Sequence, residues 1–274
     1  MDWLDALILG IVQGLAEYLP ISSSGHLVIF REILGLHLEG EDALQFDVIL
    51  HAATVLSTIV VLWPLFRDLC KSFFTFSRDD NFWYVIKILV SCIPIAIVGL
   101  FFKDLVEGMF TGNLTIVGIC LLATACLLTF AHFSDRLLSG RMKGAGRGRD
   151  ITFADALTIG VAQAVAVLPG LSRSGTTIAT GIVIGDRRDK VASFSFLMVI
   201  IPILGEALLS LKDIIGGETA GQADVPSYCL LIGFVAAFLV GCAACKWMLS
   251  LVKKGKLVWF AVYCLIVAIL CLTW

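Results

Sequence analysis

The chain has 274 residues, of which 59% are hydrophobic and 15% are charged, and its formal net charge is −2. A soluble domain carries about 25% charged residues, so this composition excludes a soluble globular protein and indicates an integral helical membrane protein. No basic arm and no stripe of Lys and Arg with interleaved aromatic residues is present, which argues against nucleic-acid binding. Nine cysteines, most of them in apolar stretches, argue against a disulfide framework.

The first predicted element is a pair of short apolar helices. Residues 3–19 and 25–36 flank the polar loop Pro20-Ile-Ser-Ser-Ser-Gly25, and each is shorter than the roughly 20 residues that a membrane crossing needs. Neither Lys nor Arg precedes Arg31, so we expect no cleaved signal peptide, which begins with a basic region. We interpret the segment as a re-entrant hairpin, whose loop must be buried in protein or line a wet cavity.

The same element recurs 150 residues later, as residues 152–168 and 175–185 around a second polar loop. Residues 6–25 align with residues 156–175 without a gap, and eight positions are identical: Ala6, Leu7, Gly10, Gln13, Ala16, Ser22, Ser24 and Gly25 recur as Ala156, Leu157, Gly160, Gln163, Ala166, Ser172, Ser174 and Gly175. Such a duplication is typical of membrane proteins that build a polar site from two interrupted helices.

Six further apolar stretches are long enough to cross a membrane. They cover residues 44–65, 83–102, 114–132, 191–211, 228–248 and 257–273. The predicted fold is an all-α integral membrane protein of six transmembrane helices plus two re-entrant helical hairpins in an inverted-topology repeat. The predicted organisation is a single membrane domain with a first repeat at 1–139, a cytoplasmic linker at 140–150 and a second repeat at 151–274.

The basic residues predict the orientation. Sixteen of the 20 Lys and Arg residues lie in one set of alternate connections, three lie in the other set, and Arg173 stands apart. The rich connections are therefore expected to be cytoplasmic, with both termini outside. Three spans per half invert the second copy, so the two polar loops can meet near the middle of the membrane.

Arg173 lies in the second loop, between two apolar helices. A guanidinium at that depth costs at least ~2.5 kcal/mol, so it is expected to face a polar cavity or an anion. Arginine is well suited to bidentate phosphate contact. The alternative is a structural ion pair with a carboxylate of the other repeat.

Glu17 lies at the end of the first short helix, one helical turn after Gln13, so the two side chains share a face. A buried carboxylate must be paired, protonated or bound to a metal. A hard cation, Mg²⁺ or Ca²⁺, beside a phosphate fits Glu17 as a ligand. Glu17 could instead act as a base, orient a histidine or pair with Arg173.

His26 opens the helix after the three serines and can serve as a nucleophile or as a general acid or base toward a phosphate ester. We interpret His51 and His132 as ordinary core residues. Ser23 is a candidate nucleophile or phosphate ligand, and the competing interpretation is a helix N-cap.

The remaining loop residues are predicted to bind phosphate, because a capped helix N-terminus presents free N–H groups and a positive dipole to an anion. They are Ser22, Ser24, Gly25, Ser172, Ser174, Gly175 and Thr177. Gln13 and Gln163 are predicted to give polar support to the site.

The two loops carry a family resemblance. Gln13-Gly-Leu-Ala-Glu-Tyr-Leu-Pro-Ile-Ser-Ser-Ser-Gly-His26 and Pro169-Gly-Leu-Ser-Arg-Ser-Gly175 resemble the two signature motifs of the undecaprenyl-diphosphate phosphatase family, the bacterial bacitracin-resistance proteins. The resemblance covers nearly the whole chain. It implies a plasma-membrane enzyme that hydrolyses undecaprenyl diphosphate to undecaprenyl phosphate and inorganic phosphate, which regenerates the lipid carrier of cell-wall synthesis.

By motif, Glu17 and His26 match the acid/base or metal-associated pair of that family, Ser23 the serine near the phosphate, and Arg173 the phosphate-binding arginine. Gln13 stands where members carry Glu or Gln, which weakens any arrangement of two carboxylates on one metal. The expected partners are the polyprenyl diphosphate and the bilayer, with a homodimer as one possible assembly and an active site that faces outward. The alternative function is a polyprenyl-phosphate carrier or flippase that uses the same anion site.

Overall fold

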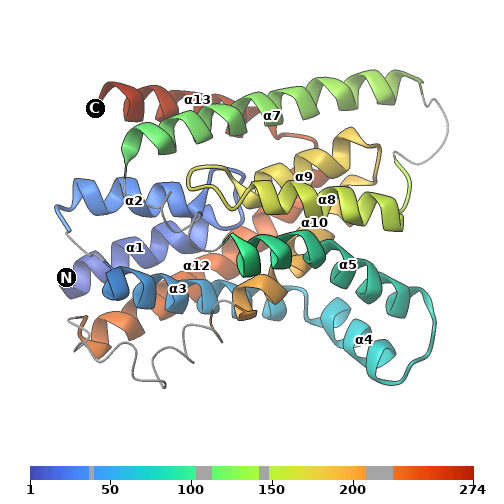
Figure 1. Ribbon diagram of the computed structural model, residues 1–274, viewed down its shortest axis with the longest axis horizontal. Coiled ribbons are helices and arrows are strands. Elements are labelled where there is room, and N and C mark those ends of the chain that lie inside the picture. Colours follow the sequence, from blue (N-terminus) through green and yellow to red (C-terminus); the bar gives the residue numbers. More distant parts are fainter. Residues whose placement is uncertain (37–39, 103–112, 142–147, 206, 208–224) are drawn as a thin grey trace.

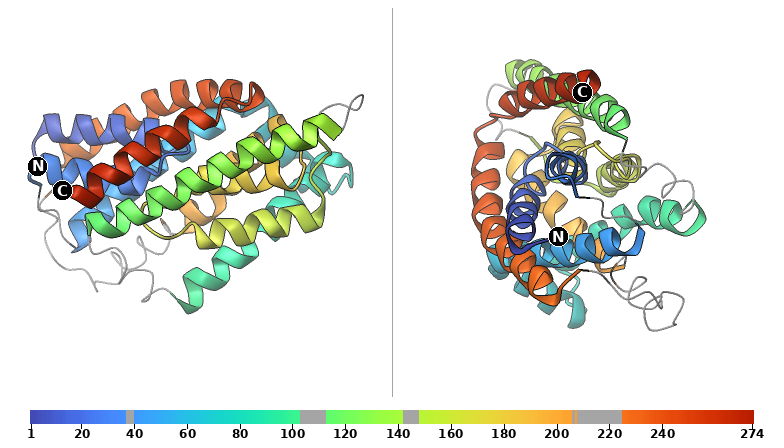
Figure 2. Two further views of the ribbon diagram at one scale, coloured as in Figure 1. Left: turned by 90° about the horizontal axis from the view of Figure 1, so that it is seen from above. Right: turned by 90° about the vertical axis from the view of Figure 1, so that its left-hand side faces the viewer.

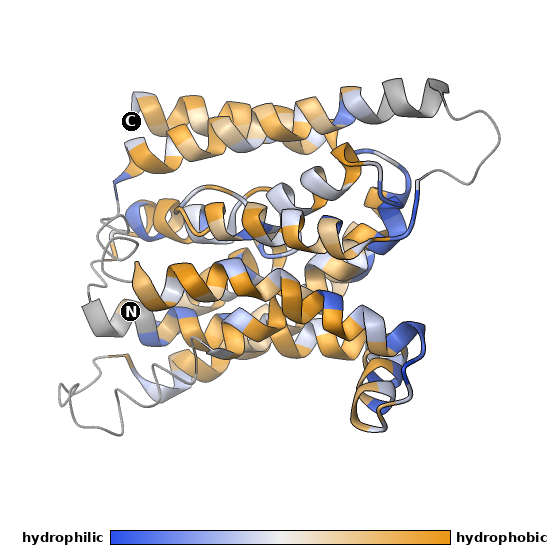
Figure 3. Ribbon diagram, turned by 45° about the vertical axis from the view of Figure 1, so that its right-hand side comes forward, coloured by the Kyte–Doolittle hydropathy of each residue, from blue (hydrophilic) through white to orange (hydrophobic). Residues whose placement is uncertain are grey.

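The structure is a computed structural model that describes residues 1–36, 40–102, 113–141, 148–205, 207 and 225–274. Within these residues it is helical, and the only β-type pairing is an isolated bridge between Arg149 and Asp186. Apolar helices pack side by side in a bundle (Figure 1). Figure 3 shows hydrophobic residues along the helices and hydrophilic residues gathered at the end that holds the α4–α5 turn. The predicted all-α class is confirmed.

The two halves contain similar series of helices. The first half holds α1 (Trp3–Ala16), α2 (Ser23–Ile33), α3 (Gly40–Val61), α4 (Trp63–Phe74), α5 (Asp80–Phe101) and α7 (Leu114–Arg141). The second half holds α8 (Phe153–Val165), α9 (Arg173–Val183), α10 (Arg188–Met198), α12 (Ser227–Lys253) and α13 (Val258–Thr273).

Three helices in the described part are long and apolar enough to cross a membrane on their own: Asp80–Phe101, Leu114–Ser134 and Ser227–Lys253. They correspond to the predicted spans 83–102, 114–132 and 228–248. Helix α13 corresponds to the predicted span 257–273, and it belongs to the shorter apolar helices. The other two predicted spans are interrupted.

The predicted span 44–65 is broken near its end. Helix α3 ends at Val61, and the chain turns by 88° into α4. Pro64 lies in the first turn of α4, where its missing N–H is tolerated, whereas within a continuous helix its ring would clash with the preceding turn. Residues 63–65 therefore belong to α4, which the sequence analysis did not predict.

The predicted span 191–211 is broken as well. Helix α10 ends at Met198, and a further helical stretch covers residues 200–205, while the rest of the predicted span falls partly outside the described residues. Pro202 has no N–H to donate to the Met198 carbonyl four residues earlier. That carbonyl instead accepts a weak hydrogen bond from Cys92 Sγ of α5, at 3.5 Å.

Each helix–loop–helix element packs its first helix into the other half of the molecule. Gly10 on α1 lies against the backbone of Gly233 on α12, and its counterpart Gly160 on α8 lies against the backbone of Ser91 on α5. A Cβ on either glycine would come within 3.0 Å of backbone atoms. The close approach requires glycine at both positions, and it shows that the sequence repeat is a structural repeat.

The tips of the two elements meet directly. Gly25 lies against Gly170, and Gly175 lies against Pro20. Residue 20 of the first loop corresponds to residue 170 of the second, and residue 25 corresponds to residue 175. The two contacts are therefore equivalent, because each joins the last residue of one loop to the first residue of the other loop. Ser174 Oγ also donates a hydrogen bond across the junction to the Leu19 carbonyl, at 3.2 Å. The two polar loops therefore come together, as the sequence predicts.

Both chain ends lie at the same end of the bundle (Figure 2), and the predicted placement of the termini outside the membrane remains a prediction. The predicted linker 140–150 includes residues 142–147, which lie outside the described residues. The predicted division into 1–139, 140–150 and 151–274 remains a prediction.

Candidate active site

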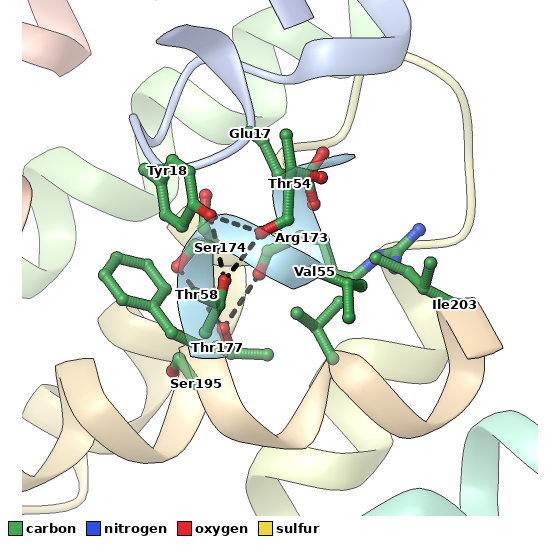
Figure 4. A pocket seen from close by; sticks show the side chains of 12 residues that line it. Glu17, Tyr18, Thr54, Val55, Thr58, Arg173, Ser174, Thr177, Ser195 and Ile203 are labelled. Carbon is green, nitrogen blue, oxygen red and sulfur yellow. Dashed lines mark hydrogen bonds between the residues drawn. The ribbon is translucent and has the colours of Figure 1, made fainter. Parts of the chain in front are cut away.

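A pocket of about 370 Å³ opens where the two tips meet α3 and α10. Polar groups on its wall come from both loops and from α3, and Figure 4 shows how their side chains lie. The lining residues are Glu17, Tyr18, Thr54, Val55, Thr58, Arg173, Ser174, Thr177, Ser195, Phe196, Val199 and Ile203. Hydroxyl groups and two opposite charges share this wall with apolar side chains.

Glu17 connects the predicted residues of the first loop. Its Oε2 accepts hydrogen bonds from Gln13 Nε2 at 3.0 Å and from Ser23 Oγ at 2.7 Å. Gln13 reaches it because it lies one turn earlier on α1. Ser23 reaches it because the loop turns back and begins α2 at that residue. A hydroxyl that donates to a carboxylate has the geometry of a nucleophile and its base.

His51 is a polar neighbour of this site that the sequence analysis missed. Its Nε2 lies 3.7 Å from Glu17 Oε2, and the two side chains are only 13% and 11% exposed. The signal was present: Asp47, His51, Thr54 and Thr58 recur at helical spacing and form one polar stripe along the helix. The interpretation of His51 as an ordinary core residue overlooked that stripe.

Arg173 is the first residue of α9 and lines the pocket. Figure 4 shows its guanidinium on the side of Ile203. Within the described part of the chain no carboxylate oxygen lies within 4.0 Å of its guanidinium, although Glu17 lines the same pocket and is close enough to interact with its charge. The free amides at the start of α9 add to its positive potential.

The hydroxyl residues of the two loops differ in their roles: two cap helices and two line the pocket, whereas Ser23 contacts Glu17 of the pocket wall without lining the pocket itself. Ser22 Oγ accepts from the Gly25 amide at 3.2 Å, and Ser172 Oγ accepts from the Gly175 amide at 3.0 Å, so both cap their helices. Ser24 Oγ lies 3.4 Å from Ser22 Oγ, away from the pocket lining. Two other predicted residues, Ser174 and Thr177, do line the pocket.

The structure does not bring His26 to the pocket wall. Its ring is 4% exposed, with Nδ1 at 2.8 Å from the Ser22 carbonyl and Nε2 at 2.8 Å from Tyr263 Oη on α13. The imidazole therefore faces the last helix. The sequence analysis also missed Tyr263, which carries no local signal because it lies in an apolar stretch.

Gln163 is fully buried, and neither of its amide atoms has a hydrogen-bond partner in the described structure. Its repeat counterpart Gln13 donates to Glu17, but Val167 stands at the matched position of the second copy. Because the partner carboxylate is missing, the predicted support from Gln163 has no visible basis.

The donors available for a metal are few. In the described ranges no group of three His, Cys, Asp or Glu side chains could hold an ion. The Glu17 carboxylate and Gln13 Oε1, which is buried without a hydrogen-bond partner, are hard oxygen donors. Mg²⁺ is commonly held by one or two protein oxygens together with substrate phosphates, so these residues fit a cation that is shared with a bound diphosphate.

Fold and site together define a multi-pass helical membrane protein with an internal repeat, in which the repeat junction forms a polar pocket next to a hydroxyl–carboxylate pair. The family model described as "Bacitracin resistance protein BacA" matches residues 6–270. The chain belongs to this family.

Curated relatives cover almost the whole chain. A protein of Bacteroides fragilis is 53% identical over 269 residues, which are 98% of this chain and 97% of the relative. A protein of Bacteroides thetaiotaomicron is 53% identical over 267 residues (97% and 96%), and one of Carboxydothermus hydrogenoformans is 41% identical over 263 residues (96% and 94%). All three are named undecaprenyl-diphosphatase.

Proposed function

We propose that this protein hydrolyses undecaprenyl diphosphate to undecaprenyl phosphate and inorganic phosphate, and so recycles the lipid carrier of the cell wall. The names of its relatives support this activity. The structural observation that carries the proposal is the Ser23–Glu17 hydrogen bond beside a pocket that Arg173 lines. These groups are a nucleophile or water-activating site, a base and an anion-binding cation, which are the parts that phosphoryl transfer requires.

In this proposal the diphosphate occupies the pocket and the polyprenyl chain stays in the bilayer. Arg173 and the first amides of α9 bind the phosphate oxygens, with the hydroxyls of Ser174 and Thr177 beside them. Charge that develops on the phosphoryl group is then stabilised by groups that are already in place, which is the main source of catalysis in reactions of this kind.

Ser23 is the preferred nucleophile. Glu17 accepts the Ser23 proton while Oγ attacks the terminal phosphorus, and the bond to the bridging oxygen breaks, which releases undecaprenyl phosphate. Water then cleaves the phosphoserine and releases inorganic phosphate. In the alternative, Glu17 activates water for direct attack and Ser23 orients it.

A divalent cation, Mg²⁺ or Ca²⁺, would be held by Glu17 and Gln13 Oε1 together with substrate oxygens, and it would neutralise phosphate charge. His26 supports the loop rather than attacking phosphorus, because its ring faces α13. The predicted roles of Ser22 and Ser172 reduce to capping, which leaves the helix amides as the phosphate ligands.

We further propose a multi-pass protein of the bacterial plasma (inner) membrane, with both termini outside and the site facing outward. The basic residues of alternate connections support this orientation. A homodimer remains compatible with the fold. The carrier or flippase alternative finds no support in the names of the relatives, and we do not adopt it.

The test is phosphate release from farnesyl diphosphate by the purified protein with Mg²⁺ or Ca²⁺. Ser23→Ala should abolish release if the serine is the nucleophile and reduce it about tenfold or more if it orients water. Ser193→Ala is the matched control, because its hydroxyl only donates to a carbonyl of its own helix. Absence of release by the unmodified protein, or equal rates for both variants, would contradict the proposal.

A further inference from the structure

The last helix, α13, contacts the first loop at two consecutive residues. Tyr263 Oη lies 2.8 Å from His26 Nε2, and Cys264 Sγ lies 3.5 Å from the Pro20 carbonyl. The rings of His26 and Tyr263 are nearly parallel, at 15°, with centroids 5.6 Å apart. A residue near the C-terminus thus makes a polar contact with a histidine 237 positions earlier.

These contacts determine which nitrogen of His26 carries the proton. The partner of Nδ1 is the Ser22 carbonyl, at 2.8 Å. A carbonyl can only accept, so Nδ1 must be the donor. Neutral His26 then has an unprotonated Nε2, and the Tyr263 hydroxyl donates to it. The hydroxyl therefore holds the ring in the orientation in which Nδ1 reaches the Ser22 carbonyl.

The carbonyl that His26 holds belongs to an unusual residue. Ser22 has φ 71° and ψ 101°, a region that residues other than glycine rarely occupy. At the matched position of the second copy, Ser172 has an ordinary φ of −63°. Thr176 stands there in place of His26, and its hydroxyl has no hydrogen-bond partner. Of the two copies, the unusual backbone therefore occurs only in the one whose histidine contacts Tyr263.

Ser22 directly precedes Ser23, whose hydroxyl donates to Glu17. Rotation of the Ser22 backbone out of its rare conformation would turn Ser23 Oγ away from that carboxylate. We propose that Tyr263 is a positioning residue: it holds the His26 ring against the Ser22 carbonyl, and through Ser22 it orients Ser23 toward Glu17. This inference rests on the proposed function of Ser23.

The test compares Tyr263→Phe with Tyr84→Phe. Both remove a hydroxyl, but that of Tyr84 is buried and has no hydrogen-bond partner in the described structure. Tyr263→Phe should lower kcat for farnesyl diphosphate about five- to tenfold, the amount expected for one lost hydrogen bond, with KM within about twofold because substrate contacts are untouched. Tyr84→Phe should leave both values unchanged.

Two further measurements separate positioning from general damage. The chain has four histidines, so ¹⁵N NMR of histidine-labelled protein can be assigned by substitution. His26 should show the Nδ1–H tautomer in the unmodified protein and in Tyr84→Phe, and a mixture in Tyr263→Phe. In a His26→Ala background, Tyr263→Phe should cause no further loss of rate.

An unchanged His26 tautomer in Tyr263→Phe would overturn the inference, and so would an unchanged kcat or a full additional loss in the His26→Ala background. The NMR result does not depend on activity. If the unmodified protein released no phosphate, the proposed function would fail, whereas the tautomer measurement would still decide whether Tyr263 holds His26.

Discussion

The two loop tips share one framework and carry different chemistry. In each tip a serine caps the second helix by accepting a hydrogen bond from the glycine three residues later, and each first helix buries a glutamine at the same place. The side chains at three other positions differ in chemical type. Where the first tip has Glu17, Ser23 and His26, the corresponding positions of the second tip hold Val167, Arg173 and Thr176.

Because of this difference, the proposed base and the proposed phosphate-binding cation lie on separate copies of the duplicated element. A carboxylate base and a guanidinium close together on one loop would pair and neutralise each other. On separate loops, Glu17 and Arg173 line the same pocket, and Arg173 forms no ion pair within the described residues. In the proposed mechanism, the base and the phosphate-binding cation therefore act on one substrate from two sides.

The strongest test of this division is Arg173→Ala. Loss of the guanidinium should lower kcat/KM about 10²- to 10³-fold, as for other groups that stabilise transition-state charge. Arg173→Lys should restore only part of the rate, because an ammonium is a point charge without the bidentate fork. The matched control is Arg67→Ala, since Arg67 is exposed and pairs with its neighbour Asp68. Equal rates for Arg173→Ala and Arg67→Ala would show that the second tip does not bind the phosphate.

The next largest effect is expected from Glu17→Gln, which keeps the shape of the side chain but removes the base. The rate should fall about 10²-fold or more. The double variant with Ser23→Ala should be little worse than either single variant, because a hydroxyl and its base act as a unit. Val167→Ala, at the matched position of the second tip, should stay within about twofold. A similar loss of rate in Val167→Ala would contradict the assignment of different roles to the two tips.

The shared framework can be tested at the two close helix contacts. Gly160→Ala and Gly10→Ala should each cost about 1–3 kcal/mol by overpacking, because a Cβ would come within 3.0 Å of backbone atoms in both cases. Gly99→Ala is the control, since a Cβ there would meet nothing within 4 Å. Thermal unfolding in detergent would measure the difference. A loss at only one of the two glycines would show that the halves are not packed equivalently.

The smallest expected effect is on the pH dependence of stability, and it concerns Asp186, whose carboxylate has no counterpart in the first copy. Burial raises the pKa of Asp186 to about 7, with Arg149 at 3.6 Å and a second carboxylate, Asp155, also paired with that arginine. Leu36 stands at the matched position of the first copy. Because the folded state holds the proton more tightly than the unfolded state, stability falls as pH rises from about 4 to 7 and then levels off.

Asp186→Asn removes the ionisable group, so the stability of this variant should not fall over that pH range. The melting temperature of the variant should exceed that of the unmodified protein by about 2–4 °C at pH 8.5, and the two should converge at about pH 4, near the unfolded pKa. A constant difference across that range would mean that the carboxyl is not protonated in the folded state.

Much of the site could be predicted because its contacts are local. Gln13 and Glu17 lie one helical turn apart, and that spacing alone brings their side chains together. The repeat indicated that two loops meet, and Arg173 stood out as a charge in an apolar stretch. The bend before α4 was missed although Pro64 was visible, because hydrophobic length was given more weight than the proline.

The sequence by itself determined the membrane class, the duplication and the identity of the chemical groups, since these depend on composition and on spacings of a few residues. Only the tertiary structure decided that His51 approaches Glu17 and that His26 contacts Tyr263 instead of lining the pocket. Those contacts join residues 34 and 237 positions apart. Helical periodicity places neighbours on one face, but it does not say which face of a distant helix they will meet.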